Sequence, residues 1–349
     1  MRAMMLEQTG PMSTTADPLA LRDWPIPEPA AGDVLLRVHA CAVCHTELDE
    51  IEGRTAPPRL PVIPGHEVVG SVIAQGDGVS KPAIGTRVGV GWIFSACGSC
   101  AWCRRGEENL CPSFTATGRD AHGGYAEYMT VPAAFTVPIP DAFTDQQAAP
   151  LLCAGAIGLR SLRLAGISNG QVLGLTGFGG SNHQVLQLAR CLYPDSPVLV
   201  WARNPAERSL ARELGATWSG DTEQQAPQQA DAIIDTTPVW KPVLAALSSL
   251  APGSRLVINA IRKESVDNDL LATLDYPAQL WLEKEIKTVA NVTRADLRDF
   301  LALAAKHSLM PRYQSYSLED ANIALRELRA GKINGAKVLV VEKRLTSDV

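Results

Sequence analysis

Short apolar runs alternate with helical segments between residues 170 and about 290, and this alternation constrains the fold more than any other feature. The runs are "QVLGLTG", "PVLVWA", "DAIIDTT" and "SRLVINA", and intervening segments such as "PAERSLARELGA" have helical periodicity. Strands that alternate with helices at this spacing form βαβ units on a parallel sheet. Uniformly apolar strands are typical of a sheet that is covered on both faces. The sequence therefore predicts an α/β domain here.

The chain before this domain has a different texture. Residues 1 to about 150 are rich in glycine and proline, with short runs such as "GDVLLRVHAC" and "HEVVGSVIAQ" between turns. This pattern predicts a compact, β-rich domain. Next, "TDQQAAPLLCAGAIGLRSLRLAG" is rich in alanine and leucine and predicts a helix into the second domain. The tail adds two amphipathic helices, "ADLRDFLALAAKH" and "LEDANIALRELRAG", and a final strand, "AKVLVVEK".

Composition excludes some classes of function. The net charge is −5 and the chain has no broad basic field, so we expect no nucleic-acid partner. The N-terminal "MRAMMLEQTG" lacks the apolar core of a signal peptide, and no stretch approaches the length of a membrane span. We therefore expect a cytoplasmic protein with no membrane partner, whose thiols stay reduced.

Four of the eight cysteines lie within fifteen residues, "CGSCAWCRRGEENLC". Clustered cysteines in a reducing compartment are more often metal ligands than disulfides. Cys97, Cys100, Cys103 and Cys111 have the spacing of a closed tetrahedral zinc site. The loop, residues about 95–113, has little apolar content, so a metal would hold its shape. A disulfide pair and an iron–sulfur cluster are the alternatives. A closed site does no chemistry, so catalysis requires other residues.

Further candidate ligands are spread through the chain. They are Cys44 in "CAVCHTELD", His66 and Glu67 in "GHE", and Cys153 in "PLLCAG". Two thiolates and one imidazole leave one position of a zinc ion open for substrate, as in catalytic zinc sites. Spacing alone does not show that these residues meet. Cys153 could instead be an apolar core residue, His66 a core or turn histidine, and Cys44 half of a C-x-x-C redox pair with Cys41.

A glycine-rich turn follows the first apolar run of the α/β domain. Gly177, Gly179 and Gly180, followed by Ser181, fit G-x-G-x-x-G up to its last position, where Asn182 replaces glycine. Such glycines allow a tight turn and close approach of the backbone to a pyrophosphate, at the N-terminus of a helix. The strand–turn–helix context supports a dinucleotide site. We expect Asn182 to hold the helix slightly further from the sheet, at small cost.

The end of the second apolar run bears on cofactor choice. Where a carboxylate would bind the adenosine ribose, the chain has Ala202, followed by Arg203, with Arg208 one turn into the next helix. A missing carboxylate removes repulsion of a 2′-phosphate, and a guanidinium can pair with that phosphate. We therefore predict a preference for NADP(H) over NAD(H). The alternative is that Arg203 points to solvent and that either cofactor binds.

Together these motifs resemble the zinc-dependent alcohol dehydrogenases of the medium-chain dehydrogenase/reductase (MDR) family, nearly end to end. The resemblance rests on "CAVCHTELD", "PVIPGHEVVG", the cysteine loop, "GGYAEY", "PLLCAG", "GFGGSNH" and the closing strand. It implies an α/β fold with a GroES-like catalytic domain at 1–150, a Rossmann domain at 151–290, and a return to the first domain at 291–349. It also implies two zinc ions per subunit and a homodimer or homotetramer.

The resemblance further implies roles for single residues. Cys44, His66 and Cys153 would bind catalytic zinc, and the four loop cysteines the structural ion. Thr46 would hydrogen-bond the substrate oxygen, Glu67 could transiently ligate the metal, and Glu47 would orient His66. His45 would contact the cofactor phosphates. Trp92 would wall the substrate pocket or, alternatively, be an ordinary packed aromatic residue.

One position departs from the family pattern. Many members have a histidine that relays the alcohol proton where this chain has Asp49. A carboxylate could accept that proton, water could bypass it, or Asp49 could be a plain surface residue. The predicted function is hydride transfer between an alcohol, or its aldehyde or ketone, and a nicotinamide cofactor. The alternatives are a zinc-independent quinone or enone reductase of the same superfamily and a zinc-stabilised binding protein.

Overall fold

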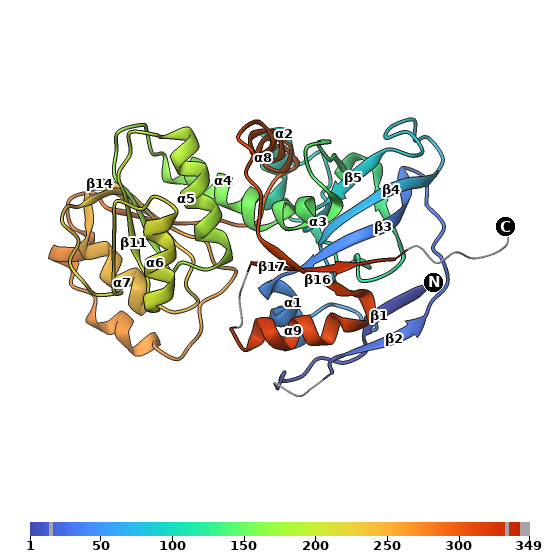
Figure 1. Cartoon of the computed structure of the whole chain (residues 1–349), viewed down its shortest axis with the longest axis horizontal. Coiled ribbons are helices and arrows are strands. Elements are labelled where there is room, and N and C mark those ends of the chain that lie inside the picture. The colour runs from blue at the N-terminus through green and yellow to red at the C-terminus, as the bar shows by residue number, and fades with distance from the viewer. Residues whose placement is uncertain (14–16, 332–334, 343–349) are drawn as a thin grey trace. The chain divides into compact units, whose positions relative to one another are not determined.

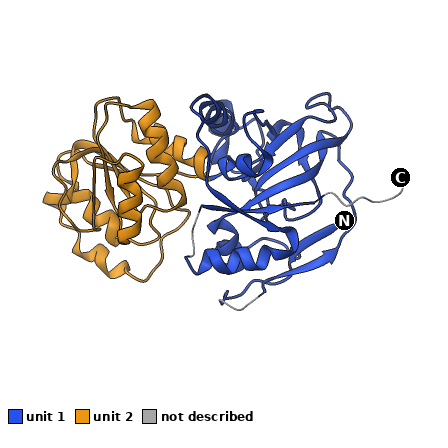
Figure 2. Cartoon of the chain, in the orientation of Figure 1, with its two compact units in different colours: residues 1–153, 292–349 blue, residues 154–291 orange. Residues whose placement is uncertain are grey.

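A computed structural model describes residues 1–13, 17–331 and 335–342, and the chain forms two compact units. Unit 1 contains residues 1–153 and 292–349, and unit 2 contains residues 154–291 (Figure 2). Figure 1 shows the chain with many of its helices and strands labelled.

Unit 1 is rich in strands. Its main sheet has the order β16-β17-β3-β4-β5-β9, and β8 pairs with β3. These strands are β3 (Asp33–Val43), β4 (Glu67–Gln75), β5 (Arg87–Val90), β8 (Tyr128–Pro132), β9 (Val137–Pro138), β16 (Tyr313–Ser317) and β17 (Ala336–Val340). Two small sheets pair β1 (Arg2–Leu6) with β2 (Leu19–Asp23), and β6 (Ile93–Ser95) with β7 (Thr115–Ala116).

Helices of different lengths complete unit 1. They are α1 (His45–Ile51), α2 (Ala101–Arg104), η1 (Glu108–Leu110), η2 (Ala133–Phe135), α3 (Asp145–Ala148), η3 (Ala149–Leu152), α8 (Arg294–Lys306), η6 (Leu318–Asp320) and α9 (Ala321–Arg329). β17 pairs antiparallel with β3, so the end of the chain closes the sheet that its beginning forms. The predicted tail helices and final strand are present, although Lys343 of that strand lies outside the described residues.

Unit 2 has a six-stranded parallel sheet of order β12-β11-β10-β13-β14-β15. The strands are β10 (Leu173–Thr176), β11 (Val198–Trp201), β12 (Trp218–Gly220), β13 (Ala230–Asp235), β14 (Leu250–Ile258) and β15 (Glu285–Thr288). The helices are α4 (Ala154–Ala165), α5 (Gly180–Leu192), α6 (Pro205–Glu213), α7 (Lys241–Ser248) and the short η4 (Asn268–Thr273) and η5 (Tyr276–Leu280). This is the strand order of a Rossmann sheet, and the predicted α/β fold is confirmed.

The order of the sheet locates its ligand edge. The chain starts at β10, builds outward to β12, and then resumes at β13 on the other side of β10. Ligands of open parallel sheets bind outside the carboxyl ends of the strands where this reversal occurs. Residues that directly follow β10 and β13 therefore lie at this ligand edge of the sheet.

The predicted continuous helix at 144–166 is wrong in its middle. The structure has α3, then η3, and then a break at Cys153 (φ −125°, ψ −77°) before α4 begins. Pro150 accounts for the end of α3 at Ala148, because it lacks the amide hydrogen that would continue the α-helical bonding. The break matters for the site, since Cys153 lies in it.

The same segment corrects the expectation that no stretch approaches a membrane span. Among the residues that the structure describes, the helical run Asp145–Ala165 is apolar and long enough by composition, and 67% of its apolar window is buried in the protein. Core helices of globular proteins pass the same test.

Candidate metal centres and nucleotide-binding turn

The four loop cysteines lie together in unit 1. Their Sγ atoms are all within 4.8 Å of one another, and Cys97 Sγ lies 3.9 Å from Cys103 Sγ. A zinc ion with Zn–S bonds of about 2.3 Å needs sulfurs about 3.8 Å apart, so the spacing fits a tetrahedral site with four thiolate ligands. Backbone amides at Cys97, Cys100, Cys103 and Ser113 each donate to one of these sulfurs at 3.3–3.5 Å.

The loop shifts the pKa values of Cys97 and Cys103 in opposite directions. Backbone amides of Ser99 and Cys100 lower the pKa of Cys97 to about 6. Burial and the neighbouring Cys100 sulfur raise the pKa of Cys103 to about 12. Opposite pKa shifts are expected for adjacent thiols, because ionisation of one thiol disfavours ionisation of its neighbour. A bound divalent cation would stabilise all of the thiolates together.

An ion pair ties the loop to the start of α8. The Arg294 side chain donates to both oxygens of Glu108, through Nε at 2.8 Å and Nη2 at 2.9 Å. The Arg294 backbone amide also donates to Glu108 Oε1 at 2.9 Å. Burial alone would raise the pKa of Glu108, but Arg294 lowers it below its ordinary value. The pair therefore anchors the cysteine loop to a segment nearly two hundred residues away.

The second cluster gathers residues from three separate segments. Cys44 lies directly before α1, His66 and Glu67 meet at the start of β4, and Cys153 follows η3. The donor atoms of these four residues all lie within 4.8 Å of one another. Cys44 Sγ and Cys153 Sγ are 4.0 Å apart, near the edge length of a zinc tetrahedron. Cys41 is buried and belongs to neither cluster, which argues against a Cys41–Cys44 redox pair.

Glu47 orients the imidazole of this cluster. Its Oε1 lies 2.5 Å from His66 Nδ1, and its Oε2 accepts the Cys44 backbone amide at 2.7 Å. In the neutral imidazole, a proton on Nδ1 facing this carboxylate leaves the lone pair on Nε2. Nε2 is buried and has no hydrogen-bond partner among the described residues. A buried lone pair beside two sulfurs is what a metal ion would satisfy, so these residues fit zinc.

The ionisable groups in this cluster shift one another's pKa values. The Cys153 thiol, followed by His66, lowers the pKa of Cys44, whereas the bond to Cys44 and burial raise the pKa of Cys153. Burial, followed by the Cys44 sulfur, raises the pKa of Glu67. The site thus favours one thiolate at Cys44, as a first metal ligand requires.

The other predicted residues of unit 1 lie around this cluster in different ways. Thr46 Oγ1 is 3.6 Å from Cys44 Sγ, whereas His45 is exposed at the first position of α1. Asp49 is buried and accepts from Arg54 Nε at 2.6 Å. It is therefore not a plain surface residue.

Trp92 is held by polar contacts as well as by packing. Its Nε1 donates to Glu50 Oε1 at 3.4 Å, its ring packs against Phe114, and the Arg119 guanidinium lies over it. Glu50 is 1% exposed, and its Oε2 has no partner among the described residues. Sequence reasoning missed Glu50, although its spacing of three from Glu47 places both on one face of α1.

In unit 2 the glycine-rich turn lies where the sequence predicts it. Gly177 follows β10 with φ +72°, and α5 begins at Gly180 with Gly179 as its N-cap. Asn182, in place of the third glycine, forms hydrogen bonds that a glycine side chain cannot form. Its buried amide donates to the carbonyl oxygens of Thr176 at 3.0 Å and Gly177 at 2.8 Å, and so ties α5 to the turn.

The arginines after β11 have different surroundings. Arg203 is exposed, and Ala202 is buried. Arg208 Nη1 donates to the carbonyl oxygens of Ala202 at 2.7 Å and Arg203 at 2.9 Å. Its guanidinium therefore holds the end of β11, a role that the sequence did not indicate.

Comparisons with known proteins agree with this geometry. The family "Alcohol dehydrogenase GroES-like domain" matches residues 30–141. A probable alcohol dehydrogenase, AdhA, of Mycobacterium tuberculosis is 43% identical over 346 residues, covering 98% of this chain and 97% of that protein. An alcohol dehydrogenase of Geobacillus stearothermophilus is 31% identical, covering 93% of this chain and 96% of that protein. A cinnamyl alcohol dehydrogenase structure from Sorghum bicolor is 26% identical, with a TM-score of 0.82 over 97% of both chains.

A GroES-like fold, a Rossmann sheet and two sets of zinc ligands define a class of NAD(P)-dependent oxidoreductase. The chain belongs to the zinc-containing alcohol dehydrogenases of the MDR family.

Proposed function

We propose that the protein interconverts primary or secondary alcohols and their aldehydes or ketones, by zinc-dependent hydride transfer to or from a nicotinamide cofactor. The observation that carries this proposal is the meeting of Cys44, His66, Glu67 and Cys153 donors within 4.8 Å. The complete ligand set argues against a zinc-free reductase. The acidic net charge of −5 argues against a nucleic-acid-binding module.

Each residue of the cluster has a separate task in this proposal. Cys44, His66 and Cys153 would hold the zinc ion, which when bound supplies Lewis-acid polarisation of the substrate oxygen. Glu67 can fill the fourth position or leave it to substrate. Thr46 would hydrogen-bond the substrate hydroxyl and take its proton. Trp92 would form a wall of the substrate pocket, held in place by Glu50.

Asp49 is proposed as the next proton acceptor, and its contact with Arg54 supplies a competing role. Arg54 Nε donates to Asp49 Oδ1 at 2.6 Å, so this carboxylate also has a structural partner. An Asp49→Asn variant separates the two roles. A relay predicts a lower oxidation rate near neutral pH with an unchanged melting temperature. A purely structural pair predicts lower stability with an unchanged pH–rate profile.

The turn of unit 2 is proposed to bind the dinucleotide through Gly177, Gly179, Gly180 and Ser181, and His45 to contact its phosphates. The preference for NADP(H) rests on Ala202 in place of a carboxylate and on the exposed Arg203. Arg208 contributes indirectly, since it fixes the backbone that carries Arg203. A kcat/KM ratio tenfold or more in favour of NAD would reject the preference.

By the same proposal, residues 1–150 are the catalytic domain, 151–290 bind the cofactor, and 291–349 return to the first domain. We propose a cytoplasmic homodimer or homotetramer. The edge strand β15 supports self-association, because all four of its residues are exposed. Ile286 of this strand is a large apolar residue, and Tyr276, Trp281 and Leu282, which shortly precede the strand in the chain, are also exposed. Sedimentation at several protein concentrations tests this assignment.

Metal removal tests the function as a whole. Dialysis against a strong chelator is expected to abolish alcohol oxidation, and Zn²⁺ is expected to restore it. A panel of alcohols and aldehydes, assayed with both cofactors, then defines the substrate class. Full turnover in a preparation shown to contain no metal would contradict the proposal.

A further inference from the structure

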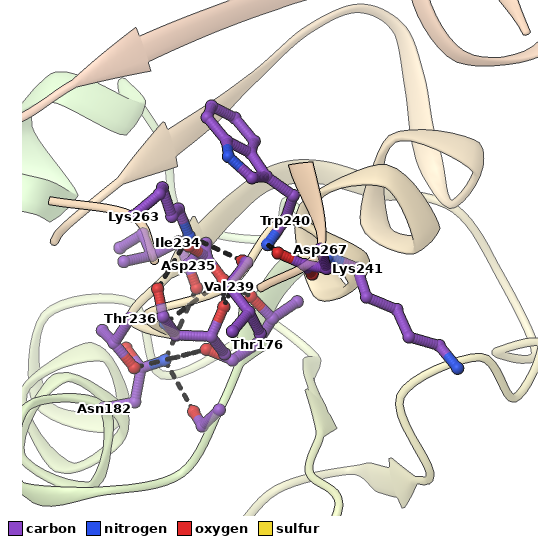
Figure 3. A network of polar contacts seen from close by, with 12 residues as sticks. Thr176, Asn182, Ile234, Asp235, Thr236, Val239, Trp240, Lys241, Lys263 and Asp267 are labelled. Atoms are coloured by element: carbon purple, nitrogen blue, oxygen red, sulfur yellow. Dashed lines mark hydrogen bonds and ion pairs between the residues drawn. The ribbon is translucent and has the colours of Figure 1, made fainter. Parts of the chain in front are cut away.

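A buried ion pair lies at the carboxyl edge of the parallel sheet in unit 2. Asp235 ends β13 and is 0% exposed, and Lys263 Nζ lies 2.5 Å from its Oδ2. The same ammonium donates to the backbone oxygens of Thr237 at 2.7 Å and Val239 at 3.1 Å. Lys263 thus joins the segment after β14 to the segment after β13 (Figure 3).

This pair is built against the glycine-rich turn. Asp235 Oδ1 accepts from Thr176 Oγ1 at 2.6 Å and from Thr237 Oγ1 at 2.7 Å. Thr176 is the last residue of β10 and directly precedes Gly177. A Cβ atom at Gly177 would lie 2.8 Å from Thr237 Cγ2, so the turn and the 236–239 segment are in contact. Asp235 therefore fixes the hydroxyls that border the turn.

The position of the pair has an electrostatic consequence. A pyrophosphate at the turn is negative, and a buried carboxylate beside it would repel it, because charges interact strongly where water is excluded. Buried ion pairs give little net stability compared with apolar side chains of the same volume. Stability alone therefore does not account for a lysine at this place, whereas cancelling the charge of Asp235 does.

We propose that Asp235 and Lys263 are positioning residues of the nucleotide site, in which Asp235 orders the edge of the turn and Lys263 makes that edge neutral toward phosphates. This inference rests on the proposed binding of a dinucleotide by unit 2. It goes beyond that proposal because it names two residues outside the glycine motif. Loss of Lys263 is expected to lower the affinity for the dinucleotide, and loss of the Asp235 charge is expected to raise it.

Fluorescence titration of the full-length holoenzyme with NADH and with NADPH tests the proposal. Lys263→Met leaves an uncompensated carboxylate, so affinity is expected to fall about tenfold, which corresponds to about 1.4 kcal/mol. High salt is expected to reduce this loss. Asp235→Asn leaves an uncompensated ammonium, so affinity is expected to rise, by about threefold. A purely structural role predicts weaker binding in both variants.

Two further variants sharpen the comparison. The double variant Asp235→Asn/Lys263→Met removes both charges and is expected to return affinity to within about threefold of the wild type. Lys241→Met is the matched control, because Lys241 pairs with the exposed Glu223 and lies outside the Asp235–Lys263 pair. We expect it to change affinity less than about twofold. If Lys263→Met does not fold, the sign of the change in Asp235→Asn decides.

Shifts of opposite sign, with recovery in the double variant, support the proposal. Weaker binding in both single variants, or no change in two folded variants, overturns it. A wild-type protein that binds neither NADH nor NADPH instead overturns the proposed function, before any variant is compared.

Discussion

The two cysteine-containing clusters of unit 1 are built in opposite ways. The four-cysteine loop takes all its donors from fifteen consecutive residues, and Cys97 in it is exposed. The Cys44 cluster takes its donors from three distant segments, and His66 and Glu67 in it are buried. A site made from one short loop can hold that loop in shape. A site made from several segments instead depends on a complete fold.

The two clusters also differ in the chemical identity of their ligand atoms. Four sulfurs can fill all four positions of a zinc ion. The second cluster offers two sulfurs, one imidazole and one carboxylate, and in the proposed function Glu67 gives up its position to substrate. Glu47 fixes the imidazole at 2.5 Å, and Thr46 stands beside the Cys44 sulfur. We therefore infer a structural role for the four-cysteine loop and a catalytic role for the Cys44 cluster.

The largest effect is expected from removal of a ligand in the Cys44 cluster. Cys44→Ser or His66→Ala is expected to lower kcat/KM by roughly a thousandfold or more, because several kcal/mol of transition-state stabilisation is lost. Circular dichroism and thermal melting should remain close to those of the wild type. Cys191→Ser, outside both clusters, is the control and should retain activity. Full activity in Cys44→Ser would refute the assignment.

A smaller loss of activity is expected from Glu47→Gln. The amide cannot replace the charge that holds His66, so metal affinity or turnover should fall about 10–100-fold. Metal content and kcat/KM measured on the same preparation distinguish these two effects. If both stay at wild-type values, Glu47 does not orient the ligand.

Cys103→Ser should act on stability instead of chemistry. We expect the zinc content to fall by one ion per subunit and the melting temperature to fall by about 5–10 °C. Turnover per folded molecule at low temperature should stay within about threefold of the wild type. A Cys103→Ser protein that is stable but inactive would remove the distinction between the two clusters.

The smallest effect is expected at the Glu108–Arg294 anchor. Glu108→Gln should lower the free energy of unfolding by about 1–2 kcal/mol, whereas Glu107→Gln, in an exposed pair, should change it by less than about 0.5 kcal/mol. Because the folded protein lowers the pKa of Glu108, its contribution is present above the unfolded pKa of about 4.3. It is lost as pH falls through the lower, folded value. Urea unfolding at pH 7 and pH 3 measures both effects.

The sequence by itself determined the elements whose signals are local. The apolar strands of unit 2, the helix at 180–192, the turn at Gly177 and the loop of four cysteines all lie where their spacing predicts. Hydrophobic periodicity and ligand spacing describe neighbours along the chain, and neighbours along the chain stay near each other in any fold. The short strands β12, β15 and β16 were not predicted, because their sequences have too little hydrophobic periodicity.

Only the tertiary structure decided which distant residues meet. Nothing in the spacing of Cys44, His66 and Cys153 places them within reach of one ion, and the resemblance to a family supplied that expectation. The break at Cys153, the pairing of Asp49 with Arg54, and the Asp235–Lys263 pair against the turn were not predicted. Such contacts depend on how strands pair and how buried charges find partners, and those choices are settled by packing of the whole domain.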